Sequence, residues 1–278
     1  MARQLALTYI RAKFKLLSAI SKKHAAEKAF ELFCTPQHRN KKPLPPIFQK
    51  GESLRFQFLN YHIQGWRWNP GQEKKVLILH GFESSVINFD RYISPLIKKG
   101  YEVLAFDAPA HGRSSGKTIN AVIYKDFINT VYNTFGPIQS FLAHSFGGLA
   151  LSLALEEIPH DESYKVVLIA PATETITAAN MFFDFLKLNP SLRPYFNQII
   201  KEKSGRTGDW FSVARAIKNF HAQVLWVHDK EDNMTPFSDI QNVIDAQLPH
   251  VQFLVTQGLG HRRIYREATI SKVVIDFL

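Results

Sequence analysis

A serine in a tight turn is the first residue of this chain that suggests chemistry. Ser145 lies in Ala143-His-Ser-Phe-Gly147, which follows a short apolar run and precedes a stretch with helical spacing. A turn of the form small-x-Ser-x-Gly holds its serine in a strained conformation, so the residues two positions to either side must be small. Ala143 and Gly147 meet that need. The turn predicts a nucleophilic serine; an ordinary serine in a glycine-rich turn is the structural alternative.

Two backbone N–H groups are candidates to hold the oxygen of a substrate attacked by this serine. The first belongs to Phe146, directly after the serine. The second belongs to Phe82 in Leu79-His-Gly-Phe82, which follows a strand-like apolar run. Amide donors aimed at a developing oxyanion stabilise the transition state of acyl transfer. The alternative for the second segment is a tight turn that only needs Gly81.

A histidine late in the chain has the position expected of the base that activates the serine. His261 lies in Gly258-Leu-Gly-His261, after the last strand-like run and before the final helical stretch. A serine nucleophile needs such a base within hydrogen-bond reach. The chain has eleven histidines, so position rather than residue type singles out His261.

The acid that orients this base is one of three carboxyl groups, namely Asp229, Glu231 and Asp232. Asp232 is favoured because a turn after a strand needs several residues before a side chain points back at the histidine. Asp229 would lie at the strand end, where its carboxylate could bond the loop backbone instead. The predicted triad is Ser145, Asp232 and His261, and Asp229 stays the alternative acid.

Further residues are candidates for the walls of a pocket around the serine. They are His80, Glu83, His144 and Arg262. The two histidines are expected to shape the site rather than act as bases. Arg262 could hold a substrate carboxylate, although a surface ion pair is the favoured alternative. No His/Cys cluster has metal-ligand spacing and no glycine-rich nucleotide motif occurs, so we expect neither a metal nor a cofactor.

The elements that must position these residues alternate between strand-like and helix-like runs. Short apolar runs with little alternation occupy residues 76–79, 103–106, 139–143, 166–170, 224–227 and 251–255. Such runs are typical of strands that are covered on both faces. Helical stretches lie near 90–99, 118–135, 147–158, 236–246 and 265–277. Before them, 54–58 and 61–68 alternate as antiparallel strands with one wet face do. The pattern predicts a doubly wound, mostly parallel α/β sheet with function at the carboxyl ends of its strands.

Two segments fall outside this alternation. About 50 residues separate Ala172 from Val224, too many for a simple crossover, and we expect a helical cap insertion at about 173–221. Residues 3–34 have the spacing of one long helix or two shorter ones, and Lys41–Ile47 is a Pro-rich linker. The expected organisation is therefore a helical N-terminal extension with linker at 1–50 and a catalytic domain at 51–278.

The positive charge of the chain is concentrated in this extension. Residues 1–50 hold eleven Lys or Arg and two acids, whereas the whole chain has a net charge of +10. The favoured interpretation is that the helix packs on the core with its basic face solvated, and the alternative is that it contacts anionic membrane surfaces as a basic amphipathic helix. Nucleic-acid binding is disfavoured because the basic stretch has little aromatic interleaving.

The same extension lacks the marks of a secretory signal. Arg11, Lys13 and Lys15 interrupt its apolar stretch, and no run approaches the roughly 20 apolar residues that span a bilayer. A cytoplasmic location is expected, which the single cysteine, Cys34, fits. A mitochondrial-type presequence is the minor alternative.

Taken together, these motifs resemble the α/β-hydrolase superfamily over roughly residues 51–278. A closer resemblance is to uncharacterised bacterial hydrolases similar to the serine aminopeptidase and lysophospholipase-like branch. The segments that carry it are Phe33-Cys-Thr-Pro36, His80-Gly-Phe-Glu-Ser84, Phe106-Asp-Ala-Pro-Ala-His-Gly112, Ala143-His-Ser-Phe-Gly147 and Gly258-Leu-Gly-His-Arg-Arg263. The chain departs from the common pattern at Ala143, where Gly is usual, and at Phe82, where many relatives carry Trp. Neither change alters the backbone donor.

The resemblance implies acyl-enzyme hydrolysis of carboxylic esters with small or lipid-like acyl groups, with Ser145, Asp232 and His261 in the triad positions. Thioesterase, amidase or peptidase, and acyltransferase activity on the same triad stay open. A non-catalytic binding protein on the same scaffold is the alternative from another class. The expected partner is a small ester-like molecule, and the oligomeric state is undecided.

Overall fold

The computed structural model describes residues 2–40 and 42–278. Lys41, part of the predicted linker, and Met1 of the predicted extension lie outside the described residues. The described chain forms two compact units. We call residues Pro36–Thr173 with Val213–Leu278 the sheet unit, and residues up to Thr35 with Glu174–Ser212 the helical unit.

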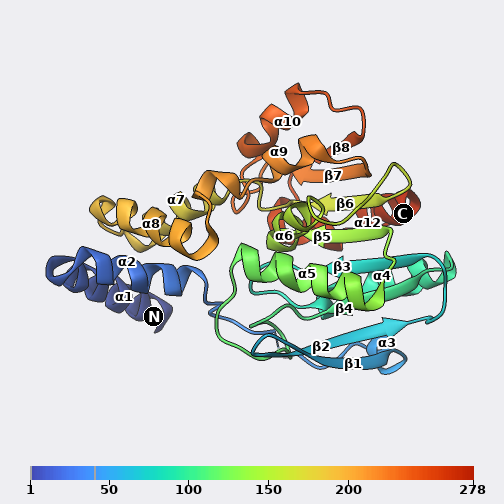
Figure 1. The fold of residues 1–278 in the computed structure, drawn as a ribbon, viewed down its shortest axis with the longest axis horizontal. Helices are drawn as coiled ribbons and strands as arrows, with labels where there is room; N and C mark the ends of the chain where they lie inside the picture. Colours follow the sequence, from blue (N-terminus) through green and yellow to red (C-terminus); the bar gives the residue numbers. More distant parts are fainter. Residues whose placement is uncertain (1, 41) are drawn as a thin grey trace. The chain divides into compact units, whose positions relative to one another are not determined.

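The sheet unit is built on eight strands in the order β1-β2-β4-β3-β5-β6-β7-β8 (Figure 1). They are β1 (Glu52–Phe58), β2 (Tyr61–Trp68), β3 (Lys75–Leu79), β4 (Glu102–Phe106), β5 (Ser140–His144), β6 (Lys165–Ile169), β7 (Gln223–Asp229) and β8 (Val251–Thr256). β2 is antiparallel to both of its neighbours, and all other pairs are parallel. The predicted mostly parallel α/β sheet is confirmed.

Helices flank this sheet on both faces (Figure 1). They are α3 (Pro46–Gln49), α4 (Asp90–Lys98), α5 (Ala121–Phe135), α6 (Phe146–Ala154), α9 (Val213–Ala216), α10 (Gln241–Asp245), α11 (Gly260–Arg263) and α12 (Ala268–Phe277). Short 3₁₀ turns add η1 (Val86–Phe89), η4 (Ile217–Asn219), η5 (Phe237–Ile240) and η6 (Ile264–Arg266). Each predicted helical stretch overlaps one of these elements, because apolar residues at helical spacing must face the sheet.

The second strand differs from its prediction. β1 alternates between exposed and covered positions, but β2 is covered on both faces from Ile63 to Trp68. On one face Trp66 and Trp68 pack edge-on against Phe48, with ring centroids 5.0 and 5.1 Å away. On the other, Gly65 lies so close to Phe106 that an added Cβ would come within 2.0 Å of its ring. The predicted wet face of β2 is wrong because α3 and Phe106, both remote in sequence, cover the strand.

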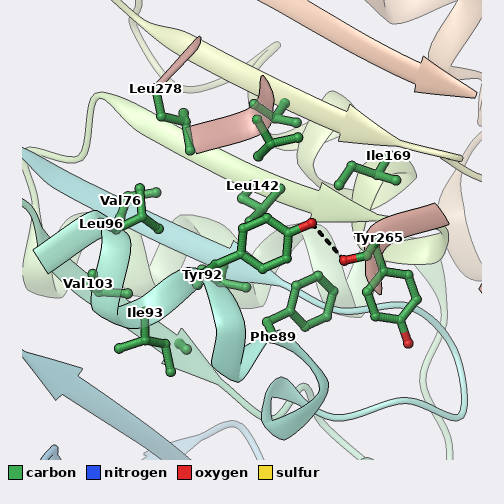
Figure 2. Packing of buried hydrophobic residues seen from close by; sticks show 14 of the residues in the cluster. Val76, Phe89, Tyr92, Ile93, Leu96, Val103, Leu142, Ile169, Tyr265 and Leu278 are labelled. Atoms are coloured by element: carbon green, nitrogen blue, oxygen red, sulfur yellow. Dashed lines mark hydrogen bonds between the residues drawn. The ribbon is translucent and has the colours of Figure 1, made fainter. Parts of the chain in front are cut away.

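One hydrophobic cluster fills the space between the sheet and helices α4 and α12 (Figure 2). Val76 and Val103 from adjacent strands meet Ile93 and Leu96 of α4 there. A polar contact lies inside this apolar layer, where the hydroxyl of Tyr92 donates a 2.7 Å hydrogen bond to the carbonyl of Tyr265. The bond ties α4 to the segment that follows α11.

The helical unit combines segments from two distant parts of the sequence. It contains α1 (Ala2–Ile20), α2 (Lys22–Phe33), α7 (Thr175–Leu186), η2 (Pro190–Leu192), α8 (Arg193–Ser204) and η3 (Gly208–Trp210). The α1–α2 break falls at Ser21, whose extended backbone and side chain, accepting from the N–H of His24, begin α2. Phe33 packs edge-on against Phe182 and Phe196, at 5.2 and 5.7 Å. None of the helices within the described ranges is long and apolar enough to cross a membrane.

The boundaries of the two compact units differ from the predicted domain boundaries. The N-terminal helices share a core with the insertion, so the first cut follows Thr35 rather than residue 50. The insertion ends at Ser212 rather than near 221, because α9 packs against α6 and belongs to the sheet unit. Both boundaries are determined by contacts between segments that are remote in sequence.

The buried tyrosine contact gives a stability prediction. Tyr92→Phe should lower the free energy of unfolding by about 1–3 kcal/mol, because it leaves the buried Tyr265 carbonyl without this donor. Urea unfolding measures the change. Tyr195→Phe, at a side chain that is 42% exposed, is the matched control and should have almost no effect. Equal stabilities of the Tyr92 variant and the parent protein would contradict the prediction.

Candidate active site

Ser145 occupies the sharp turn between β5 and α6. Its φ of 54° and ψ of −122° lie in a region of backbone conformation that residues other than glycine rarely adopt. The carbonyl of Ser145 accepts from the N–H groups of Gly148 and Ala172, at 2.9 and 3.0 Å, which holds the turn in place. Gly147 is required because a Cβ there would lie 2.7 Å from the carbonyl oxygen of His80. The turn therefore has the geometry that the small-x-Ser-x-Gly pattern predicts.

Three side chains predicted from the sequence form one hydrogen-bonded row. The hydroxyl of Ser145 lies 3.0 Å from Nε2 of His261, and Nδ1 of His261 lies 2.8 Å from Oδ2 of Asp232. All three residues are buried. Since the carboxylate accepts from Nδ1–H, Nε2 keeps its lone pair and can accept the serine proton.

Asp232 is held as a carboxylate by several donors. The N–H groups of Met234 and Thr235 donate to Oδ1 at 2.8 and 2.9 Å, and the Thr235 hydroxyl donates to Oδ2 at 2.9 Å. Burial by itself raises the pKa of Asp232, but hydrogen bonds to His261 and to these N–H groups outweigh it and lower the pKa below its ordinary value. An ionised Asp232 can stabilise a positive charge on His261.

Asp229, the alternative acid, has other partners. Its Oδ2 accepts from the Thr256 hydroxyl at 2.7 Å and from the N–H of Leu259 at 3.0 Å. Its Oδ1 accepts from the N–H of Glu231 at 3.0 Å. Burial opposes ionisation, yet these donors lower the pKa of Asp229. The carboxylate thus joins the loop after β7 to the loop after β8, the segment that leads to His261.

The loop after β3 lies directly against the serine. A Cβ on Gly81 would come within 2.7 Å of Cβ and 3.2 Å of Oγ of Ser145, so only glycine fits there without displacement. The next residue, Phe82, packs its ring edge-on against that of Phe146, with centroids 5.8 Å apart. The two residues whose N–H groups were predicted as oxyanion donors therefore lie side by side next to Ser145.

Two buried histidines hold this loop from behind. His80 accepts the N–H of Ala108 at Nε2, 3.0 Å away, and its Nδ1 lies 2.8 Å from the carbonyl of Gly81. His111 accepts the N–H of Glu83 at Nε2, also at 3.0 Å. Burial lowers the pKa to about 4 for His80 and about 3 for His111. Both are neutral at physiological pH, and neutral rings are needed because Nε2 must accept.

Glu83, a predicted pocket residue, makes two hydrogen bonds that hold the loop after β3. Its φ of 55° is left-handed. Its carboxylate accepts the N–H of Gln37 at 2.8 Å, while its own N–H goes to His111. The position of His111 in the sequence predicts no role for it. The signal was present in the segment Phe106–Gly112, where a histidine precedes a glycine required by the turn.

Asp107 anchors the next loop to the same region. Its carboxylate accepts from the Ser85 hydroxyl at 2.6 Å and from the N–H groups of Val86 and Arg113 at 3.1 and 2.9 Å. A Cβ on Gly112 would lie 2.2 Å from that carboxylate. The group is fully buried and burial raises its pKa, so it acts in positioning loops and not as an exposed acid.

The remaining predicted pocket residues differ in placement. His144 is buried beside the triad, its Nε2 3.1 Å from the carbonyl of His261 and its ring 4.4 Å from that of Tyr265. Burial holds the pKa of His144 well below its ordinary value, so it supports His261 as a neutral ring. Arg262 is exposed. Within residues 2–40 and 42–278, no group of three His, Cys, Asp or Glu side chains is placed to hold a metal ion.

The fold and these residues define an α/β-hydrolase. The family described as serine aminopeptidase, S33 (Hydrolase_4) matches residues 71–212, about half of the chain, and the chain belongs to this family. The matched region contains the loop after β3 and the Ser145 turn but ends before Asp232 and His261. The resemblance to the α/β-hydrolase superfamily is thereby confirmed.

Relatives and solved structures agree with this assignment. The uncharacterized protein YqkD of Bacillus subtilis is 23% identical over an alignment of 230 residues that covers 78% of this chain and 75% of that protein. The uncharacterized hydrolase YugF of the same organism is 29% identical over 58% of this chain and 54% of its own length. The esterase Pf2001 of Pyrococcus furiosus shares the fold with a TM-score of 0.65 and 21% identity, over 88% of this chain and 95% of that one.

The buried histidines predict a pH dependence of stability. Unfolded His80 and His111 have the ordinary pKa near 6.5, whereas in the fold the values are about 4 and about 3. Protons therefore bind the unfolded state first, and the free energy of unfolding should fall as the pH drops from about 6.5 toward 4.

His111→Phe should flatten that fall by roughly 1.4 kcal/mol per pH unit, the slope contributed by one proton. Urea unfolding at a series of pH values measures it. His62→Gln, at an exposed histidine, is the control and should keep the parent slope. Parallel curves for the His111 variant and the parent would refute the role given to His111.

Proposed function

We propose that this protein is a serine hydrolase that cleaves carboxylic esters through an acyl-enzyme. The observation that carries the proposal is the row of hydrogen bonds from Ser145 through His261 to Asp232, at 3.0 and 2.8 Å. A hydroxyl, an imidazole and an ionised carboxylate in this order can generate a nucleophile at neutral pH. Membership of a hydrolase family supports the same proposed activity.

In the first half-reaction, Oγ of Ser145 attacks the ester carbonyl carbon while Nε2 of His261 takes the hydroxyl proton. The carbonyl oxygen becomes an oxyanion, and the N–H groups of Phe82 and Phe146 stabilise it, each contributing about 3–4 kcal/mol to the lowering of the barrier. Asp232 stabilises the imidazolium. The tetrahedral intermediate then collapses, the carbon–oxygen bond to the alcohol breaks, and His261 gives its proton to that alcohol.

In the second half-reaction, a water molecule takes the place of the alcohol. His261 accepts a proton from the water as its oxygen attacks the acyl carbon, and the same two N–H groups hold the new oxyanion. Collapse breaks the bond to Ser145 and returns the proton to its Oγ. The carboxylic acid leaves, and the site is restored.

An ester is the substrate class we favour among those that this triad can serve. The family description names an aminopeptidase, an enzyme that would need a carboxylate for the substrate's ammonium group. Glu83, the acid next to the oxyanion residue, already accepts the N–H of Gln37. The fold neighbours include both an esterase and a thioesterase domain. A substrate panel should therefore compare the turnover of esters with that of thioesters and amides, and should test acyl acceptors other than water.

The proposal includes the type of substrate and the cellular compartment. The substrate is a small molecule with a small or lipid-like acyl group, and the protein acts in the cytoplasm. Cys34 fits a reducing compartment as a buried thiol whose pKa burial raises to about 12, so that it stays protonated and unreactive.

Replacement of the serine tests the nucleophile. Ser145→Ala should lower turnover of short p-nitrophenyl esters by at least about 10⁴-fold and abolish labelling by a fluorophosphonate probe, because the attacking oxygen is gone. Ser163→Ala, at an exposed serine in the same unit, is the control and should keep both. Labelling of the Ser145 variant, or activity close to that of the parent, would exclude this mechanism and favour a binding protein.

The two aspartates are separated by a paired substitution. Asp232→Asn should lower kcat by roughly 10⁴-fold, because an amide favours the wrong histidine tautomer while it keeps the shape of the side chain. Asp229→Asn should instead lower the free energy of unfolding by about 1–3 kcal/mol with a small change in kcat, because it weakens the bonds between two loops. Ester kinetics and urea unfolding of both variants distinguish the roles, and the opposite pattern would assign the triad acid to Asp229.

A further inference from the structure

Helix α1 has one face that is packed within the helical unit. Phe14 is buried, and Ile10 and Leu17 are half-buried against the rest of the unit. The guanidinium of Arg11 donates a 2.6 Å hydrogen bond to the carbonyl of Phe185 at the end of α7. Contacts with α2 and α7 thus fix which side of α1 is turned inward.

The outward side of α1 carries a second apolar row. Leu5, Tyr9, Leu16 and Ile20 are 67%, 69%, 65% and 74% exposed. Their spacings of four, seven and four residues place them along one side of the helix, which turns once every 3.6 residues. We call these four residues the α1 stripe. Single exposed apolar residues are common on protein surfaces, whereas an aligned set of large ones marks a contact site.

The surroundings of the α1 stripe are positively charged. α1 contains four basic residues and no acid, and Lys13 and Lys15 are exposed on it. Lys22 and Lys23 follow at the exposed start of α2. The sequence of the whole helical unit has twelve Lys or Arg against six Asp or Glu. Aligned apolar side chains with basic residues beside them match the chemistry of an anionic lipid surface, with acyl chains below phosphate and carboxylate groups.

We propose that the α1 stripe docks on anionic membrane surfaces, with the helix axis parallel to the membrane plane. The four apolar side chains enter the region between headgroups and acyl chains, and Lys13 and Lys15 extend their ammonium groups to the lipid phosphates. This proposal does not depend on the proposed ester chemistry.

Electrostatics favours a lipid surface over a second copy of this chain. Stripe-to-stripe pairing would bring together two helices that each carry basic residues and no acids, and like charges at close range oppose association. An anionic bilayer offers the opposite charge. It also accommodates a convex helix surface, because lipids rearrange around inserted side chains.

Vesicle co-sedimentation of the full chain tests this inference. Phosphatidylcholine vesicles containing phosphatidylserine should bind the protein at low salt, and vesicles of phosphatidylcholine alone should bind it far less. Lys13→Gln and Lys15→Gln should each weaken binding roughly fivefold, which corresponds to about 1 kcal/mol per basic residue near such a surface. Leu16→Gln with Ile20→Gln should weaken it by at least as much as either lysine change, since insertion of the apolar row is lost.

Matched variants on the sheet unit provide the controls. Leu59→Gln with Val273→Gln removes two other exposed apolar side chains, and Lys74→Gln with Lys117→Gln removes two other exposed charges. Both pairs should bind vesicles like the parent, and circular dichroism should show the same helix content in every variant.

Three results would overturn the proposal. The first is absence of binding to anionic vesicles at low salt. The second is equal binding by the α1 variants and the sheet-unit controls. The third is a dimer in light scattering that the Leu16 and Ile20 changes dissociate without any loss of vesicle binding, which would assign the α1 stripe to a second copy. Ester hydrolysis in solution should be unchanged in these variants, so failure here is distinguishable from failure of the proposed function.

Discussion

The close approach of two backbone segments, the end of β3 and the turn after β5, is the constraint on which the site depends. Gly147 lies against the carbonyl of His80, and Gly81 lies against Ser145, so neither position has room for a side chain. This contact places the loop that carries Phe82 directly against Ser145. The buried histidines, the left-handed Glu83 and the Asp107 anchor all keep the first of these segments in place.

The other half of the site depends on two aspartates three positions apart with different tasks. Asp232 faces the imidazole and has its own N–H donors, whereas Asp229 joins the loops after β7 and β8. His261 is thus oriented twice, by a direct hydrogen bond and by the position of the loop that carries it. A neutral His144 ring packs on its other side. In the proposed reaction, such double support keeps His261 within the narrow geometry that proton transfer needs.

Much of this arrangement could be predicted from local sequence. The parallel strands are short apolar runs, and Ser145, Phe82 and His261 each follow such a run in motifs whose turn geometry is determined locally. The two-sided burial of β2 could not be predicted, because Phe48 and Phe106 that cover it are remote in sequence. The role of His111 depends on a contact with Glu83, 28 residues away. The association of α2 with α8 had no local signal, since aromatic residues at helical spacing fit many partners.

The composition of the helical unit from two distant segments has a consequence for synthesis of the protein. Residues up to Thr35 leave the ribosome about 140 residues before Glu174, which at usual elongation rates is roughly 7–30 s. During that time Phe30 and Phe33 of α2 lack Phe196 of α8, the ring against which both pack. Helices α1 and α2 therefore complete their packing only after six strands of the sheet have been made, and the apolar face of α2 lacks its α8 partner for most of that interval.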